Sequence, residues 1–377
     1  MHVINEATTI IFVCVLLSII AVDSRQGSPM LLTCYAELQK PDVSIIDPNL
    51  CTHLMVIGGC FLNGNGSIVL PSDELIQPYV RLKTVNPQLK ILITLTPENE
   101  AMSKVVLSIE LMNKMLSTVE EYMERNNLDG FDYDWEFPVW SENAKRTDRD
   151  GFSTLLQKSR DKFNSKAKKY LLSIAVAAPY TIVDHAYDIE AINIHVDLVQ
   201  IMNYDFHFYS KYEPFTGFNA PLKAQPYELS VLGRMNSDYS TKYWLSAGLN
   251  SSKLVFGMPT YGRGYTLLSP ESHSLYAIAT GPSFYGENED YALMCQLMNK
   301  TGVTYVWNEN AATPYLYFVR EWIGFEDLRS VVAKTQYAKE LGVAGVMIFA
   351  LHADDYKGTC GQGKFPLINA VKKTLFS

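Results

Sequence analysis

Short apolar runs rich in β-branched residues recur along the chain and alternate with longer segments of helical periodicity. An apolar run of this length, bounded by turn residues, is typical of a strand that is buried on both faces. Such runs predict eight strands, at 31–36, 53–57, 90–95, 130–136, 171–177, 198–203, 253–259 and 345–351. Apolar residues at helical spacing predict helices at 72–86, 105–126, 150–169, 327–342 and 365–376.

Strands that alternate with helices favour a parallel sheet joined by crossovers. Eight of them favour a closed (β/α)8 TIM barrel over a doubly wound open sheet, so we predict an α/β barrel. The alternation is interrupted after the seventh strand, where residues 264–322 are rich in Tyr, Gly, Ser and Asn. Because a structureless loop of that length is unusual in a compact domain, we predict a small α+β insertion domain there, within a barrel domain at 25–377.

The N-terminus carries a longer apolar stretch, at residues 10–22, which is followed by Val22-Asp23-Ser24. This pattern is typical of a signal peptide, which we assign to residues 1–24. No Lys or Arg precedes the stretch, and this leaves an uncleaved membrane anchor as the alternative. We therefore expect a secreted, extracellular protein that does not associate with a membrane once the signal is cleaved.

Composition narrows the possible function classes. A hydrophobic fraction of 47% and a charged fraction of 19% exclude a disordered or coiled-coil chain. The net charge of −8, from 32 Lys and Arg against 40 Asp and Glu, argues against a nucleic-acid-binding surface. The sequence has no Cys-x-x-Cys motif and no His cluster, so we expect no metal site and no cofactor. We expect a monomer.

The cysteines and the sequons fit a secretory route. Cys14 is removed with the signal, which leaves an odd number of cysteines: Cys34, Cys51, Cys60, Cys295 and Cys360. Two disulfides and one free thiol are the simplest arrangement, and spacing does not say which cysteine is free. Asn-x-Ser/Thr triplets at Asn65, Asn250 and Asn299 are glycosylation acceptors on that route.

The most informative segment is the run Asp-Gly-Phe-Asp-Tyr-Asp-Trp-Glu at 129–136. Side chains alternate along a strand, so Asp132, Asp134 and Glu136 share one face. Neighbouring carboxylates on the inner face of a barrel cannot all ionise at low cost, which raises at least one pKa and suits general acid catalysis. Glu136 comes last, at the carboxyl end of the strand, where barrel enzymes carry their chemistry. The alternatives are a solvated acidic strand or a calcium loop, which the aromatic residues between the acids disfavour.

The spacing Asp129-x-x-Asp132-x-Asp134-x-Glu136 resembles the DxxDxDxE signature of family 18 glycoside hydrolases, which comprise chitinases and chitinase-like lectins. Three further segments resemble motifs of that family in the expected order, namely 202–205 (MxYD), 253–264 (seventh strand) and 345–356 (eighth strand and its exit). The resemblance covers nearly the whole mature chain.

The resemblance implies a mechanism as well as a fold. Glu136 is expected to protonate the glycosidic oxygen, and the 2-acetamido oxygen of the substrate, rather than an enzyme carboxylate, attacks the sugar with retention. Asp134, sharing a proton with Asp132, orients the acetamido group; Tyr204 hydrogen-bonds its carbonyl, and Asp205 supports the same site. The implied activity is endo-hydrolysis of β-1,4 bonds in chitin, chitooligosaccharides or another GlcNAc-containing glycan.

The resemblance also implies further site residues and the disulfide pairing. The expected substrate-binding residues are Tyr35, Met202, Tyr261, Arg263 and Phe349. The expected disulfides are Cys34–Cys51 and Cys295–Cys360, which leave Cys60 as a free, buried thiol.

Several tryptophans of the family pattern are missing. Phe349 stands where the eighth strand usually has Trp, Gln39 ends the first-strand exit, and Thr96-Pro97 follows the third strand in place of Gly-Gly-Trp. Sugar rings stack on such side chains, so their loss weakens binding of a polymer while every acid is retained. We favour an active hydrolase of shorter glycans, and a chitinase-like lectin with weak or no activity is the alternative. Asp354 and Asp355 are expected to cap or order the loop after the eighth strand.

Overall fold

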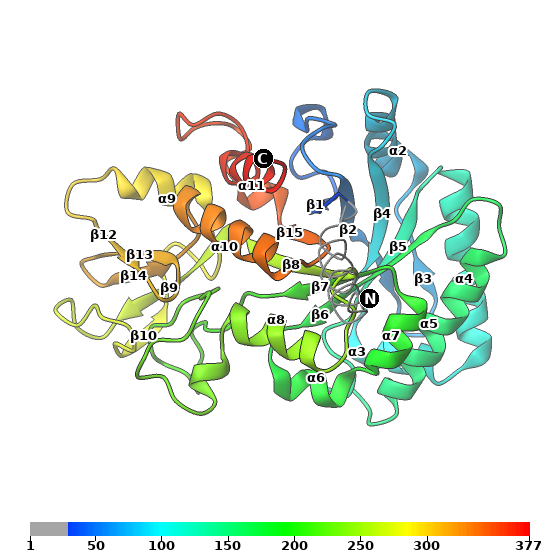
Figure 1. Cartoon of the computed structure of the whole chain (residues 1–377), viewed down its shortest axis with the longest axis horizontal. Coiled ribbons are helices and arrows are strands. Elements are labelled where there is room, and N and C mark those ends of the chain that lie inside the picture. The colour runs from blue at the N-terminus through cyan, green and yellow to red at the C-terminus, as the bar shows by residue number, and fades with distance from the viewer. Residues whose placement is uncertain (1–28) are drawn as a thin grey trace, which may run out of the picture. The chain divides into compact units, whose positions relative to one another are not determined.

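Eight parallel strands close into a barrel in the computed structural model, which describes residues 29–377 (Figure 1). The barrel strands are β1 (Leu31–Glu37), β2 (His53–Leu62), β4 (Lys90–Leu95), β5 (Gly130–Asp134), β6 (Leu171–Ala177), β7 (Leu198–Met202), β8 (Leu254–Pro259) and β15 (Gly345–Phe349). Each pairs in parallel with its neighbours, and β1 closes the ring by pairing with both β2 and β15. The predicted (β/α)8 barrel is confirmed.

Helices follow the barrel strands around the outside (Figure 1). They are α2 (Asp73–Arg81), α3 (Asn99–Val106), α4 (Ile109–Arg125), α5 (Asp148–Asn164), α6 (Tyr180–Ala186), α7 (Ile189–His195), α8 (Ser237–Ser246), α10 (Leu328–Leu341) and α11 (Pro366–Leu375). Single 3-10 turns occur at η1 (Val43–Ile45), η2 (Leu82–Thr84), η3 (Leu232–Arg234) and η4 (Leu351–Ala353). Within residues 29–377, none of these helices has the length and hydropathy needed to cross a bilayer.

Two predicted elements differ from the structure. The helix predicted at 105–126 is interrupted, because Ser108 accepts a hydrogen bond from Leu111 N and starts α4 as a new helix. The strand predicted at 130–136 ends at Asp134, since its ladder with β6 stops at the pair Asp134–Ala175. Glu136 therefore lies beyond the sheet, at the mouth of the barrel, and the sheet hydrogen bonds do not hold it.

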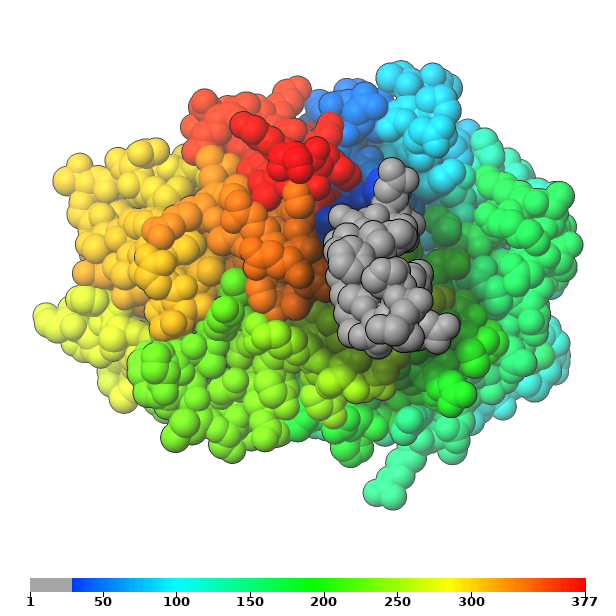
Figure 2. All heavy atoms as spheres, viewed as in Figure 1, coloured from blue at the N-terminus to red at the C-terminus, as the bar shows by residue number. Residues whose placement is uncertain are grey.

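The segment predicted as an insertion forms a second, antiparallel sheet with one helix. Its elements are β9 (Tyr261–Leu267), β10 (Ala279–Pro282), β11 (Glu289–Asp290), α9 (Tyr291–Met298), β12 (Thr304–Asn308), β13 (Thr313–Phe318) and β14 (Glu321–Gly324). The strand order is β10-β9-β14-β13-β12, and β11 pairs with β9. Tyr265, Leu267 and Trp322 form a separate buried cluster with Phe218, from the chain after β7. In Figure 2 the yellow atoms of the inserted segment lie beside the light-green atoms of the chain between β7 and β8.

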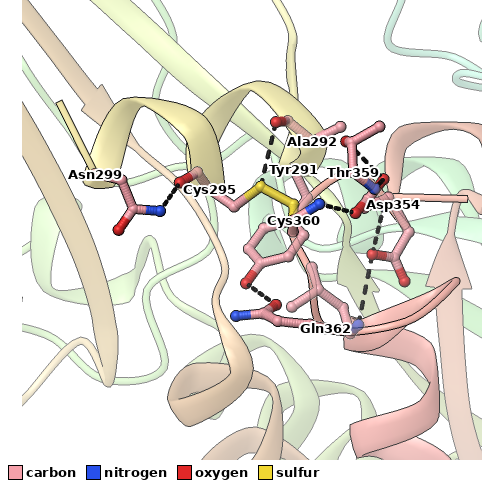
Figure 3. The surroundings of a disulfide bond; sticks show 10 residues. Tyr291, Ala292, Cys295, Asn299, Asp354, Thr359, Cys360 and Gln362 are labelled. Carbon is pink, nitrogen blue, oxygen red and sulfur yellow. Dashed lines mark hydrogen bonds between the residues drawn. A yellow bond between two sulfur atoms is a disulfide. The ribbon is translucent and has the colours of Figure 1, made fainter. Parts of the chain in front are cut away.

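The cysteines pair as the resemblance implies. Cys34 in β1 is bonded to Cys51, with Cα atoms 6.2 Å apart, and Cys295 in α9 is bonded to Cys360 after β15, with Cα atoms 5.8 Å apart (Figure 3). Cys60 is a buried free thiol. Residues 1–24, the predicted signal peptide, lie outside the described residues.

Asp354 and Asp355 order the chain after β15, as predicted. Asp355 accepts from Thr359 N at 2.9 Å and from Cys360 N at 2.7 Å. Asp354 Oδ2 accepts from Ile368 N at 3.1 Å, in the first turn of α11. Asp355 orders the loop that presents Cys360 to Cys295, and Asp354 caps the start of α11.

Candidate active site

Asp132 and Asp134 project from β5 into the interior of the barrel. Asp132 is fully buried, and its Oδ2 accepts from Tyr35 OH at 2.9 Å and from Thr94 Oγ1 at 3.1 Å. Gln200 extends this network by donating to Tyr35 OH at 3.1 Å. Asp134 is 6% exposed, and its Oδ1, like Oδ1 of Asp132, has no hydrogen-bond partner among the described residues. Asp132 is therefore anchored through Oδ2, and each of the two acids keeps an Oδ1 available to a ligand.

Three acids form a row along and just beyond β5, namely Asp132, Asp134 and Glu136. The members of this acid row hold protons more tightly than ordinary carboxyl groups. Burial raises the pKa of Asp132, and the hydrogen bonds it accepts, from Tyr35 among others, offset part of that rise. Burial raises the pKa of Asp134 well above its usual value, and the charges of Glu136 and Asp132 raise it further. Glu136 is exposed at the mouth, yet desolvation by the surrounding wall raises its pKa, with a further contribution from Asp205. A carboxyl group whose pKa is raised keeps its proton closer to neutral pH, which suits general acid catalysis.

Asp205 is held at the exit of β7 by two hydrogen bonds. Its backbone is left-handed, with φ 57°, and its N–H donates to Asn219 Oδ1 at 2.8 Å. Asn219 Nδ2 in turn donates to Tyr261 O at 3.1 Å, which links this exit to the start of β9. Arg263 Nε donates to Asp205 Oδ1 at 2.7 Å. Arg263 balances the charge of Asp205 and fixes its carboxylate near Glu136.

Phe349 lies at the centre of an aromatic cluster on the same face. Its ring is stacked with that of Tyr204 at a centroid distance of 5.8 Å, and the rings of Tyr35 and Tyr261 lie at 5.4 and 6.3 Å. Burial raises the pKa of all three tyrosines well above 10, so their hydroxyls stay protonated and able to donate. Tyr204 OH has Met347 Sδ as a weak acceptor at 4.0 Å, which a stronger acceptor on a ligand can replace.

The predicted site residues come together at the carboxyl end of the barrel. Met202 belongs to the same buried interior cluster as Tyr35, Tyr204 and Tyr261. A pocket of about 150 Å³ opens beside this cluster, lined by Asp205, Tyr261, Arg263, Asn288, Asp290, Phe349, Ala350, His352 and Ala353. It is bounded by the barrel exits on one side and by β11 of the inserted sheet on the other.

Sequence reasoning did not identify the residues that support this site. Thr94 carried a usable signal, because it is a polar residue inside an apolar strand and it lies beside Asp132 in the ladder between β4 and β5. Gln200 carried the same signal within β7. Asn219 and Asn99 lie outside strands, and no periodicity marks them.

The geometry agrees with the comparisons to known proteins. The family model described as glycosyl hydrolases family 18 matches residues 31–354. The chain belongs to glycosyl hydrolase family 18. Chitotriosidase-1 of Mus musculus is 33% identical over 346 residues, which cover 88% of this chain and 73% of the mouse protein.

Solved structures of this family include both enzymes and relatives without activity. The Group IV chitinase of Ostrinia furnacalis matches with a TM-score of 0.86 at 28% identity, over 92% of this chain and all of that chain. Human YKL-39 matches with a TM-score of 0.85, also at 28% identity, over 92% of this chain and 100% of that chain. YKL-39 is described as a pseudo-chitinase that retains chitooligosaccharide binding. Family membership therefore shows a chitinase or a chitinase-like protein, and the site has to distinguish the two.

Proposed function

We propose that this protein is a secreted, retaining hydrolase of β-1,4 bonds between N-acetylglucosamine units, with Glu136 as its acid and base. The proposal depends on one observation, the row Asp132, Asp134 and Glu136, in which each pKa is raised and two acids keep a free oxygen. A protein that merely binds sugar has no use for buried carboxyl groups that are costly to desolvate.

Each residue of the site has a role in substrate-assisted hydrolysis. Protonated Glu136 donates its proton to the glycosidic oxygen while the acetamido oxygen of the substrate attacks the anomeric carbon. Asp134, which has a free Oδ1, accepts a hydrogen bond from the acetamido N–H and stabilises the positive charge of the oxazolinium ion. Tyr204 donates its hydroxyl to the acetamido carbonyl. Ionised Glu136 then takes a proton from the water that opens the oxazolinium ion.

Asp205 raises the proton affinity of Glu136 without taking part in proton transfer. Its charge contributes to the raised pKa of Glu136, and its ion pair with Arg263 keeps it in place. The rate is therefore expected to fall on the alkaline side as Glu136 loses its proton, at a pH above the usual range for a glutamate.

The second candidate function is glycan binding without hydrolysis. The similarity to human YKL-39, described as a pseudo-chitinase that retains chitooligosaccharide binding, favours it. Phe349 does not favour it, because a phenyl ring at the centre of the cluster offers less stacking area than the indole of the family pattern. A stack contributes about 0.5–1.5 kcal/mol beyond area burial. The loss of several weakens binding, and it weakens a lectin at least as much as it weakens an enzyme.

The deciding experiment measures turnover of a short fluorogenic N-acetyl-chitooligosaccharide between pH 3 and 8. The wild type is compared with Glu136→Gln and with Glu142→Gln, a matched control on an exposed glutamate of the same loop. We expect turnover by the wild type and the control and none by Glu136→Gln. Equal, background rates for all three would contradict the hydrolase and leave the glycan-binding protein, which binding of the same oligosaccharide to Glu136→Gln then tests.

A further inference from the structure

The peptide that carries Glu136 is held from outside the barrel sheet. β5 ends at Asp134, so strand pairing does not fix the next two residues. The carbonyl oxygen of Glu136 instead accepts from Asn99 Nδ2 at 3.1 Å and from Ser141 Oγ at 2.9 Å. Asn99 opens α3 after β4, whereas Ser141 lies in the loop between β5 and α5. Two separate segments thus bind one backbone oxygen.

The orientation of the Asn99 amide is fixed by a neighbouring indole. Asn99 Oδ1 accepts from Trp135 Nε1 at 2.7 Å. An indole nitrogen can only donate, so it selects the amide oxygen and leaves Nδ2 facing the Glu136 carbonyl. Trp135 is itself immobile, because it is 1% exposed and packs edge-on against Phe152 at a centroid distance of 5.5 Å. The donor that reaches Glu136 is therefore oriented before any ligand arrives.

Ser141 occupies both polar groups of the peptide that follows Glu136. Its hydroxyl accepts from Phe137 N at 2.7 Å and donates to Glu136 O at 2.9 Å. The same side chain thus closes a loop of five residues onto the backbone of Glu136. Rotation of this peptide, which would swing the Glu136 side chain, breaks both bonds at once.

We propose that Asn99 and Ser141 are positioning residues that hold the Glu136 carboxyl in line with Asp134 and the scissile bond. This inference rests on the proposed function, in which Glu136 is the acid. Because a misplacement of about 1 Å at a reacting group costs on the order of 10²-fold in rate, loss of either bond is expected to lower kcat about 10- to 100-fold. KM is expected to change little, since both bonds are made to the protein's own backbone.

Asn99→Asp gives a signature that a merely structural role does not. The carboxylate still accepts from Trp135, but it cannot donate to Glu136 O, and it places a negative charge beside Glu136. A nearby negative charge raises the pKa of Glu136, so the alkaline limb of the pH profile of kcat/KM moves to higher pH. Ser141→Ala is expected to lower kcat without moving the alkaline limb. Ser141→Thr keeps the hydroxyl and is expected to keep kcat close to that of the wild type. The matched control is Ser153→Ala, which removes a hydroxyl that donates to Arg149 O within α5.

The test combines kcat, KM, pH profile and Tm for these variants with 13C NMR titration of the Glu136 carboxyl, assigned with Glu136→Gln. Lower kcat at unchanged KM and Tm, with the alkaline limb raised in Asn99→Asp, supports the positioning role. Wild-type kcat and pH profile in both variants overturn it. If the wild type turns over no faster than Glu136→Gln, the proposed function fails, and the titration still decides the inference: an unchanged pKa of Glu136 in Asn99→Asp contradicts it.

Discussion

Two pairs of aspartates lie at the mouth of the same barrel, and they are satisfied in opposite ways. After β15, Asp354 and Asp355 direct both of their oxygens to N–H or O–H groups of the loop and of α11. In β5, Asp132 and Asp134 each keep one oxygen without a partner among the described residues. Both pairs are buried, one within β5 and the other in the chain that follows β15.

The difference shows how structure separates chemical acids from structural ones. A buried carboxylate whose lone pairs are filled by backbone N–H groups organises the chain and has no capacity left for a ligand. A buried carboxyl that keeps a free oxygen is costly to maintain, which is typical of a site that does chemistry. The sequence predicted different roles for the two pairs, and the structure shows the difference in their hydrogen bonds.

The largest effect is expected from Asp134→Asn. This variant removes the proton-sharing carboxyl next to Glu136 and is expected to lower kcat by about 10²–10⁴-fold, the range of general acid–base contributions. The variant stays folded, because burial already disfavours the charged form of Asp134. The measurements are turnover of the fluorogenic oligosaccharide and Tm. The control is Asp161→Asn, at an exposed position of α5. Wild-type turnover in Asp134→Asn would remove the distinction between the two pairs.

Asp355→Ala is expected to produce the converse result. It leaves the N–H groups of Thr359 and Cys360 without an acceptor, each at a cost of about 1–3 kcal/mol where buried. The free energy of unfolding and Tm therefore fall. Among the described residues the carboxylate of Asp355 accepts from Thr359 and Cys360 and not from the acid row, so kcat is expected to stay within about 3-fold of wild type at temperatures where the variant is folded. A fall in kcat with unchanged Tm would show that this pair also takes part in catalysis.

The smallest effect concerns the pH dependence of stability. Burial raises the pKa of Asp354 to about 7, although the N–H groups of Ile368, Asp355 and Leu367 lower it in part. The folded protein therefore binds this proton at pH values where the unfolded chain has lost it, and this group makes stability fall as pH rises from about 4 to 7. Thermal unfolding at a series of pH values tests this. Asp354→Asn is expected to be less stable throughout but to show a shallower fall, and an unchanged slope would contradict the assignment.

The barrel was predictable because its strands carry their own signal. Apolar runs buried on both faces and separated by helices leave few topologies, and the closed eight-stranded order follows from them. Strand ends were less certain: the alternation that groups Asp132 with Asp134 continues through Glu136, while the hydrogen-bond ladder stops earlier. Sequence periodicity shows which face of a strand a side chain lies on. It does not show at which residue the hydrogen bonds to the neighbouring strand stop.

The acids of the site were predictable from their spacing along a strand and the tyrosines only from the resemblance to family 18, whereas the residues that support them were not predictable. Asn219, Asn99 and Ser141 act through single side-chain hydrogen bonds to the backbone of distant segments. Such bonds depend on where loops meet in space, and a loop asparagine in a sequence has no feature that separates it from a solvated one.

The two disulfides lie on either side of the seam where the barrel closes. β1, the first strand, pairs with β15, the last, and Cys34 lies opposite Ile348 in that ladder. Fraying from the chain ends is an easily accessible mode of local opening, and in a closed barrel it begins at the seam between the first and last strands. Cys34–Cys51 joins β1 to the residues just before β2, and Cys295–Cys360 joins the chain after β15 to helix α9 of the inserted segment. The strands on both sides of the seam are thus cross-linked to neighbouring segments, and local opening of the barrel is expected to begin elsewhere.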